Sequence, residues 1–152
     1  MTHLIALIDG SSYSQSVCDL TRWVAERTDA SVDLMHVLGR RGVGSESADL
    51  SGNLKLGARS ALLAELADLD EQKNKLELKR GRLLLEDAKT GLEEAGLAKV
   101  GTKLRHGDLI DSVTEFEGDA DLILIGKRGE AADFAKLHLG SNLERVVRAA
   151  HK

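Results

Sequence analysis

The segment from Asp121 to Ala150 constrains the fold of this chain more than any other stretch. It begins with four consecutive apolar residues, Leu122 to Ile125, and such a run is typical of a strand buried on both faces of a parallel sheet. The strand ends at Gly126, a second glycine follows at Gly129, and Gly140 opens a helix. Apolar residues recur in that helix at helical spacing, at Leu143, Val146, Val147 and Ala150. The order of strand, glycine loop and helix predicts an open α/β sheet.

The same order of elements predicts a site for an anion. In open α/β sheets ligands bind beyond the carboxyl ends of the strands, and a helix N-terminus offers unpaired N–H groups and a positive dipole end. Other phosphate loops fit worse, because Gly126 to Glu130 lacks the Lys-Ser/Thr of a Walker A loop and no GxGxxG motif follows the first strand. The predicted ligand group is therefore a phosphate.

A second continuous apolar run, His3 to Ile8, predicts another central strand. This strand ends at Asp9, and Gly10 to Ser14 then supply turn and helix-capping chemistry. A helix is expected from about Ser14 to Arg27, and one face of it carries Val17, Leu20 and Val24. Taken without any resemblance, Asp9 is interpreted as a helix-entry residue of a strand-helix turn.

These two segments resemble the universal stress protein family. In that family an aspartate ends the first strand. Later in the chain a loop wraps the phosphates of ATP, and this loop consists of a glycine, two residues, a second glycine, nine residues and then Gly-Ser or Gly-Thr. Here the intervening stretch, Glu130 to Leu139, has ten residues. The resemblance implies that Asp9 lies near the ribose and a divalent metal such as magnesium.

The resemblance also implies an adenine contact at the end of the strand predicted from Ser31 to Val37, where the family commonly has a His-Val pair. His36 remains open between a packed strand histidine and a ligand. His138 remains open between a loop residue and a nucleotide contact. The implied nucleotide-binding residues are Ile8, Asp9, Val37, Ile125, Gly126, Gly129, Gly140, Ser141 and Asn142.

The middle of the chain contains a Gly- and Ser-rich crossover, Leu38 to Gly57, and then a region of helical composition, Ala58 to Ala95. A single helix of that length would run about 57 Å, so a break is expected near Asp68–Asp70 or at Gly81. The charges are interpreted as a solvated face, and a coiled-coil or partner helix is the alternative, although heptads are not sustained. The expected apolar stripe comprises Leu62, Leu66, Leu69, Leu76, Leu83 and Leu84.

Alternating residues from Val100 to Arg105 predict a half-exposed strand at a sheet edge. Asp108 is expected to cap the next helix, and a role as a ligand is the alternative. The predicted topology is an open parallel sheet of order 3-2-1-4 with helices on both faces, in one domain over residues 1–152. The family's usual fifth strand would follow Lys152. The resemblance therefore suggests the first half of a tandem protein, or a homodimer that covers the edge strand.

Composition limits the function. A formal charge of -4 and 3% aromatic residues argue against nucleic-acid binding, and no apolar run has membrane length. A cytoplasmic location is expected. Cys18 is interpreted as a packing residue, and no catalytic triad is identifiable by position. Three hypotheses follow: an ATP-binding stress-response regulatory module, an assembly module without nucleotide, and a slow ATPase.

Overall fold

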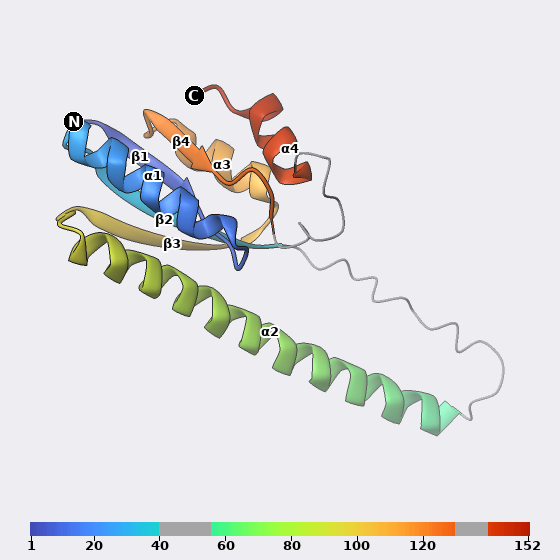
Figure 1. Cartoon of the computed structure of the whole chain (residues 1–152). Coiled ribbons are helices and arrows are strands. Elements are labelled where there is room, and N and C mark those ends of the chain that lie inside the picture. Colours follow the sequence, from blue (N-terminus) through green and yellow to red (C-terminus); the bar gives the residue numbers. More distant parts are fainter. Residues whose placement is uncertain (40–55, 130–139) are drawn as a thin grey trace.

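The chain folds as an α/β sandwich in which strands and helices alternate (Figure 1). The computed structural model describes residues 1–39, 56–129 and 140–152. The strands are β1 (His3–Leu7), β2 (Ser31–Gly39), β3 (Val100–Gly107) and β4 (Leu122–Ile125). The helices are α1 (Tyr13–Thr28), α2 (Leu56–Glu94), α3 (Leu109–Glu117) and α4 (Ser141–Ala149). All strand pairs are parallel and their order is β3-β2-β1-β4, which confirms the predicted order.

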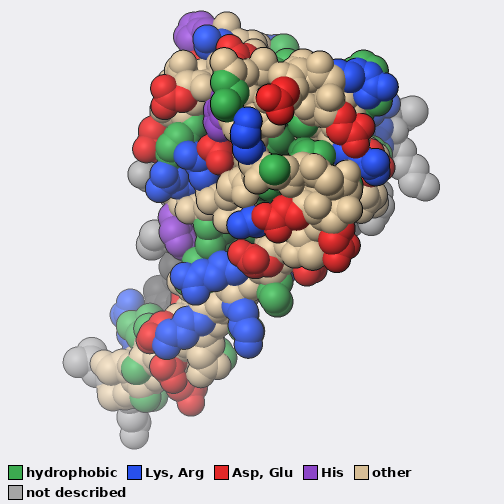
Figure 2. Space-filling model, turned by 90° about the vertical axis from the view of Figure 1, so that its left-hand side faces the viewer, with side chains coloured by type: hydrophobic (Ala, Val, Ile, Leu, Met, Phe, Trp, Pro, Cys, Tyr) green, Lys and Arg blue, Asp and Glu red, His purple; other side chains and the backbone are tan. Residues whose placement is uncertain are grey.

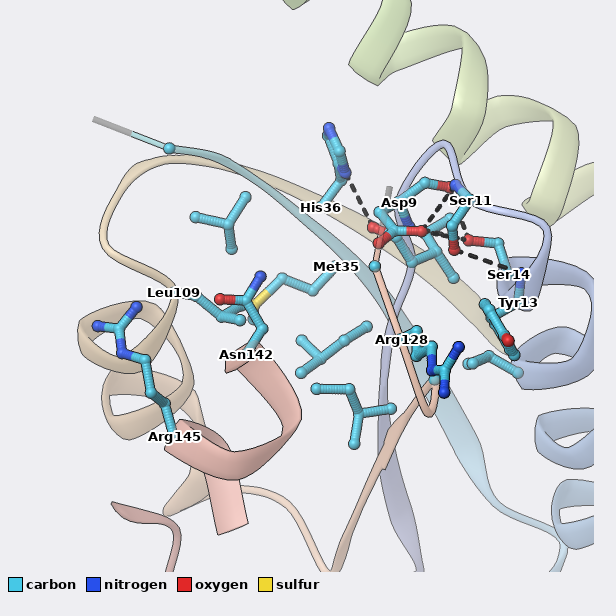
Figure 3. Close-up of a pocket in the computed structure, with 18 of the residues that line it drawn as sticks. Asp9, Ser11, Tyr13, Ser14, Met35, His36, Leu109, Arg128, Asn142 and Arg145 are labelled. Carbon is cyan, nitrogen blue, oxygen red and sulfur yellow. Dashed lines mark hydrogen bonds between the residues drawn. The ribbon is translucent and has the colours of Figure 1, made fainter. Parts of the chain in front are cut away.

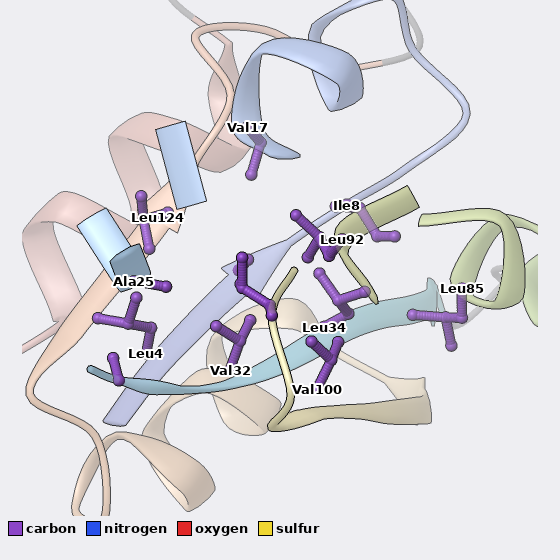
Figure 4. Close-up of a cluster of buried hydrophobic side chains, with 13 residues drawn as sticks. Leu4, Ile8, Val17, Ala25, Val32, Leu34, Leu85, Leu92, Val100 and Leu124 are labelled. Atoms are coloured by element: carbon purple, nitrogen blue, oxygen red, sulfur yellow. The ribbon is translucent and has the colours of Figure 1, made fainter. Parts of the chain in front are cut away.

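The two faces of the sheet bury separate sets of side chains. On one face, α1 and α2 pack over alternate residues of the central strands, such as Leu4 of β1 and Leu34 of β2 (Figure 4). On the other face, Ile5 and Met35 pack against α3 and α4. Since successive side chains of a strand point to opposite faces, a continuous apolar run is required where both faces are covered. β1 and β2 meet this requirement.

β4 lies at the edge of the sheet, and its burial differs from the prediction. Among the described residues it pairs with β1 alone, and 40% of Leu122 is exposed. The expectation of a strand buried on both faces is therefore wrong for part of this run. Val147, expected on the apolar face of α4, is also exposed.

α2 is a single continuous helix of 39 residues, so the predicted break at Asp68–Asp70 or Gly81 is wrong. At 1.5 Å per residue it spans about 58 Å. Figure 1 shows the reason it needs no break: its C-terminal part packs along the sheet and its N-terminal part runs past the sheet edge. Within the described ranges, neither α2 nor any other helix combines the length and apolarity needed to cross a membrane.

The buried faces of α1 and α2 also differ from the predicted stripes. In α2, Leu85 and Leu92 reach the core, whereas Leu76 and Leu83 are exposed. In α1, Thr21 is fully buried and 52% of Leu20 is exposed. The buried hydroxyl of Thr21 donates to the Val17 carbonyl at 2.6 Å, which removes the cost of burying it.

Gly81 marks the point where α2 crosses β2 and β3, and its substitution should reveal how tight this contact is. A Cβ at Gly81 would lie 2.9 Å from His36 Cδ2 and 3.0 Å from Leu104 Cδ1. The His36 ring is held by a hydrogen bond to the Ile8 carbonyl and cannot move freely. We expect Gly81→Ala to lower the free energy of unfolding by about 1–3 kcal/mol, as measured by urea denaturation.

Gly91 in the same helix provides the matched control. A Cβ there would meet nothing within 4 Å, so Gly91→Ala should gain about 0.5–1 kcal/mol from helix propensity alone. Equal stabilisation by both substitutions would contradict a tight contact at Gly81.

Candidate functional site

A cavity of about 500 Å³ opens at the carboxyl ends of the strands (Figure 3). It is lined by the ends of β1, β2 and β4 and by the first turns of α1, α3 and α4. β1 leads into α1 on one face of the sheet, while the chain after β4 reaches α4 on the other face. The cavity therefore lies at the switch point of the sheet, where open α/β folds bind ligands.

Asp9 organises the turn between β1 and α1. Its Oδ1 accepts hydrogen bonds from the Ser11 amide at 2.8 Å and from the Ser14 hydroxyl at 3.1 Å. The Ser14 hydroxyl also accepts from the Asp9 amide at 2.9 Å and lies 2.6 Å from the Asp9 carbonyl. The other carboxylate oxygen, Oδ2, faces the loop after β4, since a Cβ at Gly129 would lie 3.3 Å from it. One oxygen thus fixes the turn while the other is directed at the glycine loop.

The loop after β4 lies against the start of α4. The Gly140 amide donates to the Lys127 carbonyl at 3.0 Å, and a Cβ at Gly140 would lie 3.1 Å from Arg128 Cα. Glycine is thus required for this close approach of two backbones. As the N-cap of α4, Gly140 offers no side chain to the amide groups of the first turn. Such groups are suited to binding an anion.

The opposite wall is built by α3 and α4. Asp108 caps α3 by accepting from the Ile110 amide at 2.8 Å, which confirms the predicted cap. Its Oδ2 lies 2.6 Å from Nη2 of Arg145 on α4. This hydrogen bond to Arg145, with that to the Ile110 amide, lowers the pKa of Asp108. Gly107 before it has φ of 120°, a conformation that side chains other than glycine rarely adopt.

His36 is packed between β2 and α2. Its Nδ1 lies 2.8 Å from the Ile8 carbonyl, and because a carbonyl can accept but not donate, Nδ1 carries the proton. The ring also approaches Gly81 of α2. His36 therefore has the environment of a packed strand histidine. Val37 and Met35, which point to the other face of β2, supply an apolar wall of the cavity.

The nine residues named from the sequence divide into two groups. The residues that line the cavity are Ile8, Asp9, Val37, Ile125, Gly126, Gly129 and Asn142. Gly140 and Ser141 do not line it; they are the N-cap and the exposed first residue of α4. The stretch Glu130 to Leu139, including His138, lies outside the described residues.

The lining residues that were not named as site residues from the sequence include Tyr13, Met35, Arg128 and Arg145. Met35 could have been found, because it is two residues before Val37 and shares its face of the strand. Arg128 could have been found because it lies between the two loop glycines. Arg145 gives no such signal, since its position depends on how α4 docks against α3.

The charges around the cavity are mixed. Asp9 and Asp108 contribute carboxylates, and Arg128 and Arg145 contribute guanidinium groups. Within residues 1–39, 56–129 and 140–152, no three His, Cys, Asp or Glu side chains gather in a way that could hold a metal ion. Burial raises the pKa of the Cys18 thiol, which packs against the core beneath α1, as expected for an unreactive cysteine.

The comparisons with known proteins agree on one family. The model of the universal stress protein family matches residues 1–152. The chain is 36% identical over 153 residues to universal stress protein Slr1230 of Synechocystis sp., covering 100% of this chain and 53% of that protein. The chain thus spans about half the length of this curated relative.

Solved structures show the same fold. One solved structure is that of hypothetical protein MJ0577, described as a structure-based assignment of its biochemical function. It aligns with a TM-score of 0.70 and 21% identity, covering 99% of this chain and 91% of that one. A universal stress protein in complex with cAMP aligns with a TM-score of 0.61 and 18% identity, covering 99% and 92%. On the match of the family model over its whole length, the chain belongs to the universal stress protein family.

Proposed function

We propose that this chain is an ATP-binding regulatory module of the universal stress protein family. The observation that carries the proposal is the position of Asp9 Oδ2 directly beside the glycine loop in the wall of the switch-point cavity. A triphosphate needs backbone amides and cations at close range, and the loop from Gly126 to Gly129 with the start of α4 offers both.

The two ends of the cavity suit the two ends of a nucleotide. Met35 and Val37 form an apolar surface against which an adenine ring would pack. The phosphates would lie along Gly126, Gly129, Gly140 and Ser141, with Ile8, Ile125 and Asn142 beside them. Support also comes from a protein of the same fold that was solved in complex with cAMP.

Asp9 would act through a divalent metal. A carboxylate close to a triphosphate repels it unless a cation lies between them. Magnesium fits the residues present, because it is commonly held by one or two carboxylates together with substrate phosphates rather than by an all-protein cage. Bound in this way, it would supply positive charge to the phosphates while Asp9 Oδ2 orients it.

The test is a calorimetric titration of ATP with and without magnesium. We expect the unmodified chain to bind ATP about tenfold or more tightly with magnesium than with a chelator, a difference of about 1.4 kcal/mol. In Asp9→Asn this magnesium dependence should disappear, because a neutral amide no longer supplies a charged ligand.

Asp119→Asn provides the control. Asp119 is exposed at the C-terminal end of α3, before β4, and it does not line the cavity. Its variant should retain the full effect of magnesium. Absence of any ATP binding by the unmodified chain would end the proposal, and an unchanged magnesium effect in Asp9→Asn would make Asp9 a turn residue alone.

A second candidate function is assembly without nucleotide, favoured by the edge of β4. In the described ranges no strand pairs with its outer side, and Leu122 of this strand is 40% exposed. An unpaired strand is a template for another chain or for another domain of a longer polypeptide. Such a module would show no heat with ATP in the titration above.

A further inference from the structure

A row of leucines, which we call the leucine seam, runs along α2 from the part beyond the sheet to just past Gly81: Leu62, Leu66, Leu69, Leu76 and Leu83. Leu62 is half-buried and the other four are exposed. Four of them recur at intervals of seven residues, Leu62, Leu69, Leu76 and Leu83. Residues seven apart lie almost on one line of a helix, with a drift of only about 20° per heptad. Leu69 and Leu76 are 60% and 67% exposed. From Leu66 to Leu83 the seam therefore faces solvent along about 25 Å of helix.

The charges beside the seam are separated along the helix. Between Glu65 and Glu71 the charged residues are all acidic: Glu65, Asp68, Asp70 and Glu71. From Lys73 to Arg82 they are mainly basic, with Lys73, Lys75, Lys79, Arg80 and Arg82 against the single acid Glu77. Glu71 and Lys75 also pair within the helix at 2.9 Å. Figure 2 shows acidic, basic and hydrophobic side chains next to one another on the part that projects from the body.

Both patterns have an approximate two-fold symmetry about Gln72. Reversal of the helix about this residue brings Leu62 close to the position of Leu83, and Leu69 close to that of Leu76. The same reversal places the acidic segment where the basic segment was. A surface that is complementary to its own reversed copy is what an isologous two-fold interface requires.

We propose that the leucine seam binds the seam of a second copy of this chain in an antiparallel pair. In this arrangement the leucines of the two helices interdigitate, and each acidic segment lies against the basic segment of the other copy. A parallel pair is disfavoured, because it would set the four acids of one helix beside the same four acids of the other. Heptad positions occupied by Lys73 and Arg80 rather than leucine make the pair weaker than a full coiled coil.

The size of the interface sets the strength of the association. A helical strip about 30 Å long and 10 Å wide falls below the size of a standard stable interface. We expect dimers at tens of micromolar and above, and weaker association at high salt because the charge contacts are at the surface. This association is separate from the cavity and independent of ATP.

Sedimentation equilibrium of the 152-residue chain tests the proposal. The unmodified chain should show a monomer–dimer equilibrium, and the double variant Leu69→Glu, Leu76→Glu should remain monomeric with unchanged helix content by circular dichroism. Leu20→Glu is the matched control, since Leu20 is also an exposed leucine, 52% exposed, but on α1. It should dimerise like the unmodified chain.

Cysteine cross-linking tests the orientation, in a Cys18→Ser background. Gln72→Cys should form a disulfide between copies, because Gln72 lies at the centre of the antiparallel pair. Leu62→Cys should not, because the two copies of position 62 would lie about 30 Å apart. Each of three outcomes would overturn the proposal. The unmodified chain could be strictly monomeric, the double variant could still dimerise, or Leu62→Cys could cross-link efficiently. Retained dimerisation would assign the contact to another surface such as the β4 edge.

Discussion

Gly129→Val should weaken ATP binding by about 100-fold or more, equivalent to about 2.7 kcal/mol, while the fold is preserved. A Cβ at Gly129 meets only Asp9 Oδ2, at 3.3 Å, and no backbone within 4 Å. The larger valine side chain would therefore displace the Asp9 carboxylate and cover the loop amides to which the phosphates are proposed to bind. Calorimetric titration measures the affinity, and circular dichroism measures the fold.

Gly118→Val is the control for this substitution. Gly118 follows α3, has a helical backbone conformation, and would meet nothing within 4 Å if a Cβ were added. Its variant should bind ATP like the unmodified chain. Gly140→Val is less informative, because its side chain would meet the backbone of Lys127 and Arg128 and disturb the start of α4. Normal affinity in Gly129→Val would exclude this loop as the phosphate site.

Leu34→Ala should lower the free energy of unfolding by about 2–5 kcal/mol, a large share of the stability of a domain of this size. Leu34 is fully buried at the centre of the cluster beneath α1 and α2. Removal of its side chain leaves a space between β2 and two helices that the regular sheet cannot easily close. Urea denaturation followed by circular dichroism measures the loss.

Leu20→Ala should change the stability by less than about 0.5 kcal/mol, because Leu20 is half exposed on α1. A similar loss in both variants would mean that Leu20 is covered in solution. That outcome would also contradict the use of Leu20 as a non-interacting control for the leucine seam.

The sheet and the main parts of the site could be predicted from the sequence. Apolar runs identified β1 and β4, and the rule that parallel strands share one carboxyl edge placed Asp9 and the glycine loop together. Asp108 could be recognised as a helix cap because its role depends on amide groups within three residues of it. The assignment of nucleotide-binding roles remains a prediction until ATP binding is measured.

The site was less predictable where residues from distant elements meet. The pair of Arg145 and Asp108 joins α4 to α3, and no local pattern connects positions 37 residues apart. The contact of Gly81 with His36 likewise joins α2 to β2. A glycine inside a helical sequence indicates a break by its low propensity, but here it permits a close approach to the sheet.

The sequence by itself determined the kinds of elements, their order in the sheet and the turn chemistry at Asp9, Gly126 and Asp108, because each depends on a few neighbouring residues or on the topology of parallel strands. Tertiary structure alone decided which leucines of α2 are buried. Leucines occur on several sides of this helix, and only the position of the sheet selects Leu85 and Leu92 for the core while leaving Leu69 and Leu76 exposed. Helical periodicity can show that a face is apolar, but what covers that face depends on parts of the protein that are far away in the sequence.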